Sequence, residues 1–138
     1  MDLVVDTNIL LACFKPNSVT RRLIAIEDLH LFTTEYQLIE VKEYVGKIAD
    51  KYSLSESFIE ETFMFLEEHL EIVPKEDYQN FISKVENLIS DKDDLPALAL
   101  AAAKNIAVWS NDPHFEEQDK IKVYKTKELI ELIKRSEL

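Results

Sequence analysis

Short apolar runs alternate along the chain with longer segments in which apolar residues recur every three or four positions. The short runs predict buried β-strands, and the three-to-four spacing predicts amphipathic α-helices. The predicted strands cover residues 3–5, 31–32, 71–73, 106–109 and 123–124. The predicted helices cover residues 8–13, 19–29, 34–48, 53–70, 78–89, 95–103 and 126–133. Because strands alternate with helices, we expect an α/β fold with a parallel sheet of about five short strands, covered by helices on both faces.

Polar residues mark the points where several of these helices begin. Thr34 is followed three residues later by Gln37, and Ser53 is followed by Glu56. Both pairs match a capping box, in which two side chains satisfy the free backbone N–H groups of the first turn. Thr126 is the predicted cap of the last helix.

One predicted helix differs from the others because it has no polar face. Residues 95–103 are apolar throughout, and Pro96 suits the first turn of a helix. A helix without a polar face must be buried, so we expect it in the core. No repeat, low-complexity tract or linker-like segment divides the chain, so we expect a single domain over residues 1–138.

Composition narrows the function classes. The chain has 138 residues and a formal net charge of −11, which argues against a generally basic nucleic-acid binder. A single glycine argues against glycine-rich phosphate loops, and a single cysteine, Cys13, excludes an intramolecular disulfide framework and a cysteine-based metal cluster. No apolar run approaches the roughly 20 residues of a membrane span, and the first residues lack the positive charge of a signal peptide. We therefore expect a soluble cytoplasmic protein without a membrane partner.

Four acidic residues occupy positions where a parallel sheet would gather them. Asp6 directly follows the first predicted strand, Asp112 follows the fourth, Asp94 begins the buried helix, and Glu40 lies in the second turn of the helix that opens at Thr34. Ligand sites of such sheets lie at the carboxyl ends of the strands. Clustered carboxylates repel each other unless a cation joins them, and oxygen ligands suit Mg²⁺ or Mn²⁺ rather than zinc. Such a metal can activate water and stabilise the charge of a phosphodiester displacement.

Three segments carry a resemblance to a known family. Residues 4–10 (VVDTNIL) resemble the N-terminal motif of PIN domains, residues 91–101 (DKDDLPALALA) resemble their third acidic motif with its alanine-rich helix, and residues 108–112 (VWSND) are similar to the fourth. Glu40 stands where the family has its second-motif glutamate. The order and the spacing match over essentially the whole chain, so the resemblance implies a three-layer PIN-like fold and a metal-dependent ribonuclease.

The resemblance also implies roles for individual residues. Asp6, Asp94 and Asp112 would ligate the metal, and Glu40 would ligate the metal or a bound water. The implied supporting residues are Thr7 or Asn8, which would orient the first aspartate, Ser110, and Asp93, which a one-residue slip would exchange with Asp94. Where many members carry a further acid, this chain has His114, so a second metal would be weakly held.

Partners follow from the same resemblance. Many small PIN domains are toxins of the VapC type that a cognate antitoxin inhibits, so we expect an RNA substrate, an antitoxin and a homodimer. The residues that offer positive charge to RNA are Lys15, Arg21, Arg22, Lys42, Lys47 and Lys51.

Other interpretations stay open at this point. Asp6 and Asp94 are also good helix caps, Asp112 is a common turn residue before Pro113, and Glu40 is an ordinary exposed helix acid. The net charge leaves room for a catalytically weak or inactive PIN-like module that acts through partners. A phosphoryl-transfer enzyme is a third class, although it usually has a second aspartate where this chain has Asn8.

Overall fold

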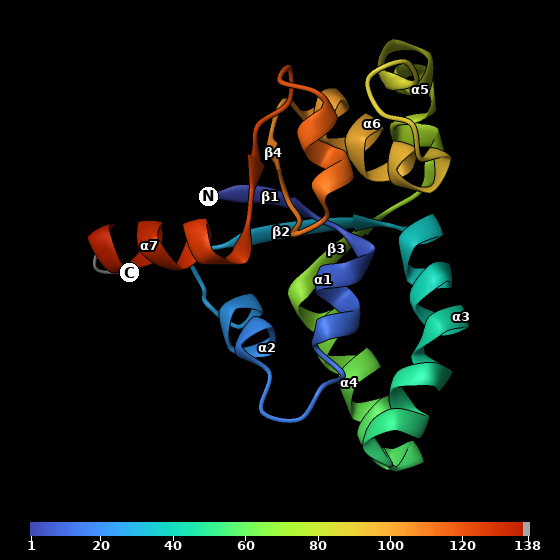
Figure 1. The fold of residues 1–138 in the computed structure, drawn as a ribbon, viewed down its shortest axis with the longest axis vertical. Helices are drawn as coiled ribbons and strands as arrows, with labels where there is room; N and C mark the ends of the chain where they lie inside the picture. Colours follow the sequence, from blue (N-terminus) through green and yellow to red (C-terminus); the bar gives the residue numbers. More distant parts are fainter. Residues whose placement is uncertain (137–138) are drawn as a thin grey trace.

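The computed structural model describes residues 1–136, and at its centre lies a twisted sheet of five parallel strands (Figure 1). The strand order is β3-β2-β1-β4-β5. The strands are β1 (Asp2–Val5), β2 (His30–Thr34), β3 (Leu70–Val73), β4 (Ala107–Trp109) and β5 (Val123–Tyr124). The predicted parallel α/β sheet is therefore confirmed. Because β1 and β4 are neighbours, the residues that follow them lie at one edge.

Within residues 1–136, seven helices surround the sheet. They are α1 (Thr7–Ala12), α2 (Val19–Ile24), α3 (Glu35–Tyr52), α4 (Glu56–His69), α5 (Gln79–Val85), α6 (Leu95–Lys104) and α7 (Thr126–Ser136), with short 3₁₀ turns at Lys75–Asp77, Lys92–Asp94 and Pro113–Glu117. In Figure 1, α5 and α6 lie on one side of the sheet, and α1, α2 and α4 lie on the other. Helix α3 stands beside α1 at the end where the strands finish.

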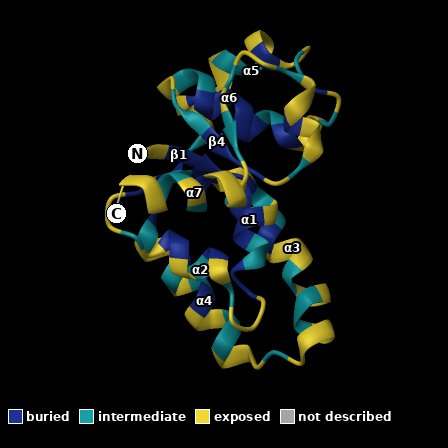
Figure 2. Ribbon diagram, turned by 60° about the vertical axis from the view of Figure 1, so that its left-hand side comes forward, coloured by how far each residue is buried: buried dark blue, intermediate teal, exposed yellow. Residues whose placement is uncertain are grey.

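The two faces of the sheet support two separate hydrophobic clusters. Leu3 and Val5 of β1 belong to the cluster under α1, α2 and α4, whereas Val4 between them belongs to the cluster under α5 and α6. This alternation follows from the two-residue period of a strand. The prediction of a buried helix at 95–103 is confirmed for its first part: residues 96–101 of α6 are buried (dark blue in Figure 2), while Ala102 and Ala103 are partly exposed.

The first predicted capping box is confirmed, and it positions α3. The Thr34 hydroxyl oxygen accepts from the backbone N–H of Gln37 at 3.0 Å, and the Gln37 side-chain oxygen accepts from the N–H of Thr34 at 3.2 Å. The buried Gln37 amide also donates to the carbonyl oxygen of Val5 at 2.6 Å. The start of α3 is therefore tied to the last residue of β1, directly before Asp6.

The second predicted capping box is wrong. Ser53 ends α3 in a left-handed conformation with φ of 52°, and Ser55 is the residue whose hydroxyl accepts from the N–H of Phe58 to begin α4. The sequence Ser-Leu-Ser offers two candidate caps, and the end of the preceding helix uses the first. Thr126, the predicted cap of the last helix, is the first residue of α7. Its hydroxyl oxygen accepts hydrogen bonds from the side chains of Trp109 and Asn111.

Besides α4, two helices are shorter than predicted. Helix α2 ends at Ile24 rather than Leu29, because the chain turns there to enter β2 at His30, whose N–H donates to the carbonyl oxygen of Met1. Helix α5 covers 79–85 rather than 78–89. No helix within residues 1–136 is long and apolar enough to cross a membrane.

Candidate functional site

A cleft of about 370 Å³ lies between α1, α3 and the start of α6, at the carboxyl ends of β1 and β4. All four predicted acids, Asp6, Glu40, Asp94 and Asp112, line this cleft. The other residues that line it are Thr7, Asn8, Leu11, Tyr44, Lys47, Ile48, Asp91 and Asp93. Sequence reasoning therefore selected residues that the fold brings together from four separate elements.

Asp6 is the most constrained of these acids. It directly follows β1, is 3% exposed, and its backbone N–H donates to the carbonyl oxygen of Trp109 in β4 at 3.0 Å. One carboxylate oxygen accepts from the N–H of Thr7 at 2.8 Å, and the other accepts from the Ser110 hydroxyl at 2.8 Å. Both oxygens of Asp6 are thus oriented by hydrogen bonds before any ligand arrives.

Ser110 couples two of the acids. Its buried hydroxyl donates to Asp6 and accepts from the backbone N–H of Asp112 at 3.0 Å. The Asp112 carboxylate in turn accepts from the N–H of His114 at 3.0 Å, which starts the 3₁₀ turn Pro113–Glu117. The helix-cap interpretation of Asp6 and the turn interpretation of Asp112 are therefore both correct. A carboxylate oxygen has more than one lone pair, so these contacts leave room for a further partner.

Glu40 reaches the cleft from α3. The Thr7 hydroxyl donates to a Glu40 carboxylate oxygen at 2.9 Å and so joins α1 to α3. The Thr7 side chain therefore orients Glu40, and Asp6 is oriented by the Thr7 backbone and by Ser110. Asn8 lines the cleft and is exposed.

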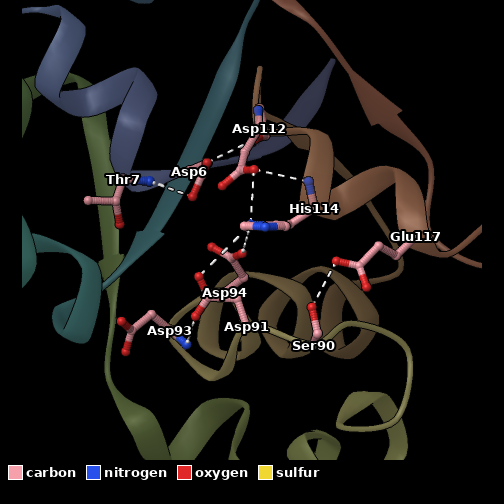
Figure 3. Close-up of polar contacts among 10 residues, drawn as sticks. Asp6, Thr7, Ser90, Asp91, Asp93, Asp94, Asp112, His114 and Glu117 are labelled. Carbon is pink, nitrogen blue, oxygen red and sulfur yellow. Dashed lines mark hydrogen bonds and ion pairs between the residues drawn. The ribbon is translucent and has the colours of Figure 1, made fainter.

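The structure distinguishes Asp94 from Asp93. Asp93 lies at the rim, where it accepts a hydrogen bond of 2.6 Å from the Tyr36 hydroxyl. Asp94 is 8% exposed and faces the other acids, and its Oδ2 is buried with no hydrogen-bond partner in the described part of the chain (Figure 3). Asp94 occupies the N-cap position of α6 but makes no side-chain capping hydrogen bond. The capping interpretation of Asp94 is therefore wrong.

Burial and mutual repulsion raise the pKa values of these acids. Burial, opposed by the hydrogen bonds from Ser110 and Thr7, raises the pKa of Asp6 from 3.8 to about 6. Burial and the charges of Asp6, Asp91 and Asp112 raise the pKa of Asp94 from 3.8 to about 7, although His114 opposes the rise. The pKa of Glu40 is also raised, chiefly by burial. The cleft therefore disfavours the ionised form of these carboxylates, and a bound cation would favour it.

Two residues of this site were missed by sequence reasoning. The His114 Nδ1 lies 3.2 Å from an oxygen of Asp112, 3.8 Å from Asp94 Oδ2 and 4.0 Å from an oxygen of Asp91. In Figure 3 the His114 ring lies between Asp112 on one side and Asp91 and Asp94 on the other. Donor atoms of Asp91, Asp94 and His114 all lie within 4.8 Å of one another. For His114, the sequence signal was its position two residues after Asp112. For Asp91, the sequence offered no signal beyond its acidic neighbours.

The donor set fits a divalent cation. Asp94 Oδ2 is a buried acceptor without a donor, and it faces carboxylates whose repulsion a cation would relieve. Carboxylate oxygens are the ligands that Mg²⁺ and Mn²⁺ prefer, and one imidazole is compatible with Mn²⁺. Asp94 belongs both to the predicted set Asp6, Asp94 and Asp112 and to the set Asp91, Asp94 and His114. Asp94 is therefore the residue that both ligand sets share.

Comparison with known proteins identifies the family and the fold. A family model described as PIN domain matches residues 4–132. No curated protein matches the chain. The chain is similar in structure to VapBC2 from Rickettsia felis, solved bound to a DNA fragment from the promoter, with a TM-score of 0.62 and 20% identity over 91% of this chain and 98% of that chain.

Two further solved structures have a similar fold. VapBC-1 from nontypeable Haemophilus influenzae has a TM-score of 0.63 and 16% identity over 91% of this chain and 98% of that chain. FitAcB from Neisseria gonorrhoeae has a TM-score of 0.59 and 17% identity over 90% of this chain and 96% of that chain. These likenesses show that the chains share a fold.

Proposed function

The chain belongs to the PIN domain family, and from this premise we propose that it is a Mg²⁺- or Mn²⁺-dependent endoribonuclease, the toxin of a toxin–antitoxin pair. The observation that carries the proposal is Asp94 Oδ2, a buried carboxylate oxygen that has no hydrogen-bond partner in the described residues and lies in a cleft lined by Asp6, Asp91 and Asp112. Buried carboxylate oxygens are normally hydrogen-bonded, and a cation would satisfy this one.

We assign the metal to Asp6, Asp94 and Asp112, with Asp91 and His114 as further donors on the same side of the cleft. When bound, the cation would lower the pKa of water and neutralise charge that develops on the phosphoryl group. Asp6 is held by Thr7 and Ser110, so its carboxylate needs little reorganisation to meet a cation.

We propose that Glu40 accepts the proton of the attacking water. One of its oxygens accepts from the Thr7 hydroxyl, and burial raises the pKa of Glu40, which makes it a stronger base than an exposed glutamate. The reaction would be hydrolysis: a water oxygen bonds to phosphorus as the bond from phosphorus to a ribose oxygen breaks. The water would give one proton to the Glu40 carboxylate, and the leaving ribose oxygen would take a proton from solvent.

The toxin assignment rests on the resemblance of the sequence motifs and on the solved structures that have a similar fold. The sequence motifs are similar to those of VapC-type toxins, and two of the solved structures with a similar fold are named VapBC. We accordingly propose RNA as the substrate, a cognate antitoxin as the partner and a homodimer as the assembly. Ile39 and Met64 are 56% and 61% exposed and supply apolar surface for such contacts.

One observation favours a second candidate, an inactive PIN-like module. His114 already places a nitrogen within 4.0 Å of three carboxylates. In its protonated form it would supply the positive charge that a metal otherwise brings.

Cleavage of labelled RNA in Mn²⁺, Mg²⁺ or excess chelator separates these functions. We expect wild-type protein to cut RNA only with a metal, and Asp94→Asn to abolish cutting. Asp50→Asn on the exposed face of α3 removes the same charge outside the cleft and should leave cutting intact. If calorimetry detects no Mn²⁺ binding near millimolar concentration and no RNA is cut, the inactive module is the better description.

A further inference from the structure

The cleft extends beyond the acids, and its far part has a different chemistry. There it is lined by Leu11 of α1 and by Tyr44, Lys47 and Ile48 of α3. Lys47 is the only basic residue that lines the cleft within the described chain. One end of a single cleft therefore suits a cation, and the other offers an aromatic ring, an amine and apolar walls.

The α3 helix brings the two parts into line. Glu40 and Tyr44 are four residues apart, so their side chains lie on one face of the helix, one turn from each other. The Thr7–Glu40 hydrogen bond holds that face against α1 (Figure 1). Whatever contacts Tyr44 is therefore about one helical turn, or roughly 5 Å, from the residue that handles the attacking water.

Tyr44 is exposed and lies beside an amine. The side chain is 45% exposed although it borders a cleft, and the Lys47 amine lies 5.9 Å from the centre of its ring. An exposed ring beside an amine has the features that bind a nucleotide, because bases stack on aromatic rings and phosphates attract lysine. Lys47 is the only basic residue that lines this acidic cleft in the described residues. Contacts with a base and its phosphate would therefore have to come from Tyr44 and Lys47.

We infer that the Tyr44–Lys47 part of the cleft is the nucleotide subsite next to the cleaved phosphate, where Tyr44 stacks on a base of single-stranded RNA and Lys47 contacts the adjacent phosphate. This inference rests on the proposed function for the identity of its ligand. It selects Lys47 from the six basic candidates that the sequence offered, because Lys47 alone among them lines the cleft.

The same helix supplies a matched control. Lys51 and Tyr52 form a second lysine–tyrosine pair, with the amine 5.4 Å from the ring centre and Tyr52 36% exposed, but neither residue lines the cleft. A general effect of tyrosine or charge on α3 would appear at both pairs. An effect of the subsite appears only at Tyr44 and Lys47.

Binding is measured by fluorescence anisotropy with a labelled random single-stranded RNA decamer, in Mg²⁺ and in an Asp6→Asn background so that the RNA survives. We expect Tyr44→Ala to weaken binding about 5- to 100-fold. Tyr44→Phe keeps the ring and should bind nearly as well as the parent, and Tyr52→Ala should be unchanged. Lys47→Ala should reduce the slope of log affinity against log salt by about 0.7, the value of one phosphate contact on a single strand.

A Tyr44→Trp variant gives a direct signal. The native tryptophan, Trp109, is fully buried, so quenching of the new fluorophore by RNA reports stacking at position 44. Unchanged RNA binding by Tyr44→Ala, or equal loss in Tyr52→Ala, overturns the subsite and leaves the cleft to another occupant such as a peptide of a partner protein.

Failure of the subsite and failure of the proposed function give different results. If wild-type protein cuts RNA and Tyr44→Ala cuts with unchanged KM, the ribonuclease stands and the subsite is wrong. If no variant cuts RNA but Tyr44→Ala still loses binding, the subsite stands and the ribonuclease is wrong.

Discussion

The acidic cleft and the surroundings of Arg21 each contain a charged residue with a buried side-chain atom that lacks a hydrogen-bond partner, and the neighbouring groups differ. In the described chain, Asp94 Oδ2 and Arg21 Nε are the two buried side-chain atoms without a hydrogen-bond partner. Asp94 faces carboxylates of its own sign. Arg21 donates through another guanidinium nitrogen to the Thr62 hydroxyl, and its guanidinium lies 5.0 Å from the ring centre of Phe58 and 5.2 Å from that of Phe65.

The difference separates a structural charge from a functional one. Aromatic rings present negative charge on their faces, so Phe58 and Phe65 compensate Arg21 from within the fold. At the cleft, the charges of Asp6, Asp91 and Asp112 oppose the ionisation of Asp94 and His114 favours it, so a bound cation would complete the compensation. The sequence placed Arg21 among the candidates for RNA binding, whereas the structure engages it in packing between α2 and α4.

The largest expected effect comes from removing a charge at the cleft. Asp6→Asn keeps the shape of the side chain and an acceptor for the Thr7 N–H. We expect RNA cleavage to fall by about 100- to 1,000-fold, the scale on which single electrostatic groups act in active sites. Circular dichroism should show an unchanged fold, and cleavage that persists at the parent rate would place the active site elsewhere.

Metal should stabilise the protein through the cleft alone. A ligand at 100 times its Kd adds about 2.7 kcal/mol to the free energy of unfolding. We expect Mn²⁺ to raise the Tm of wild-type and Arg21→Met protein equally and to leave the Tm of Asp94→Asn unchanged. A full Mn²⁺ response in Asp94→Asn would show that the metal binds outside this set.

Substitution of Arg21 should change the stability of the protein and not its metal binding. Arg21→Met keeps much of the apolar volume but removes the hydrogen bond and the contacts with two rings, so we expect a loss of about 1–2 kcal/mol in urea unfolding. Arg22→Met on the exposed side of α2 is the control and should change stability by less than about 0.5 kcal/mol. Equal losses in the two variants would contradict a special role for Arg21.

The last expected effect is a pH dependence of the metal-free protein. The pKa values of Asp6 and Asp94 are raised in the folded state to about 6 and about 7, from 3.8. Between these values the folded protein binds more protons than the unfolded chain, so the contribution of these acids to stability is complete below about pH 4 and is lost as the pH rises through 6 and 7. Urea unfolding in chelator at pH 5 and pH 7.5 measures this loss. The double variant Asp6→Asn, Asp94→Asn should lose less stability over that range, and an equal loss would assign the effect to other groups.

The sequence predicted the architecture and the positions of the acids because both follow from local patterns. Hydrophobic spacing is a local property, and the strand ends it marked at Val5 and Trp109 are those of the structure. The Thr34–Gln37 capping box is also local and is confirmed. The Ser53 cap was wrong because its choice depends on where the previous helix ends.

Other features depend on contacts between distant residues. The sequence could not predict the hydrogen bond from Thr7 to Glu40, which is 33 positions away. Nor could it predict the one from Ser110 to Asp6, which is 104 positions away. These pairs form because β1 and β4 are neighbours in the sheet and α3 is tied to the end of β1 through Gln37.

By itself, then, the sequence determined that acids follow buried strands of a parallel sheet and that little glycine or basic charge is available for another kind of site. Only the tertiary structure decided that Asp93 lies at the rim of the cleft while Asp94 is buried, that His114 and Asp91 lie beside Asp94, and that Arg21 lies against two aromatic rings. The physical reason is that side-chain periodicity along the chain specifies which face a residue occupies. Compensation of a buried charge is set by the groups that packing brings within a few ångströms of it.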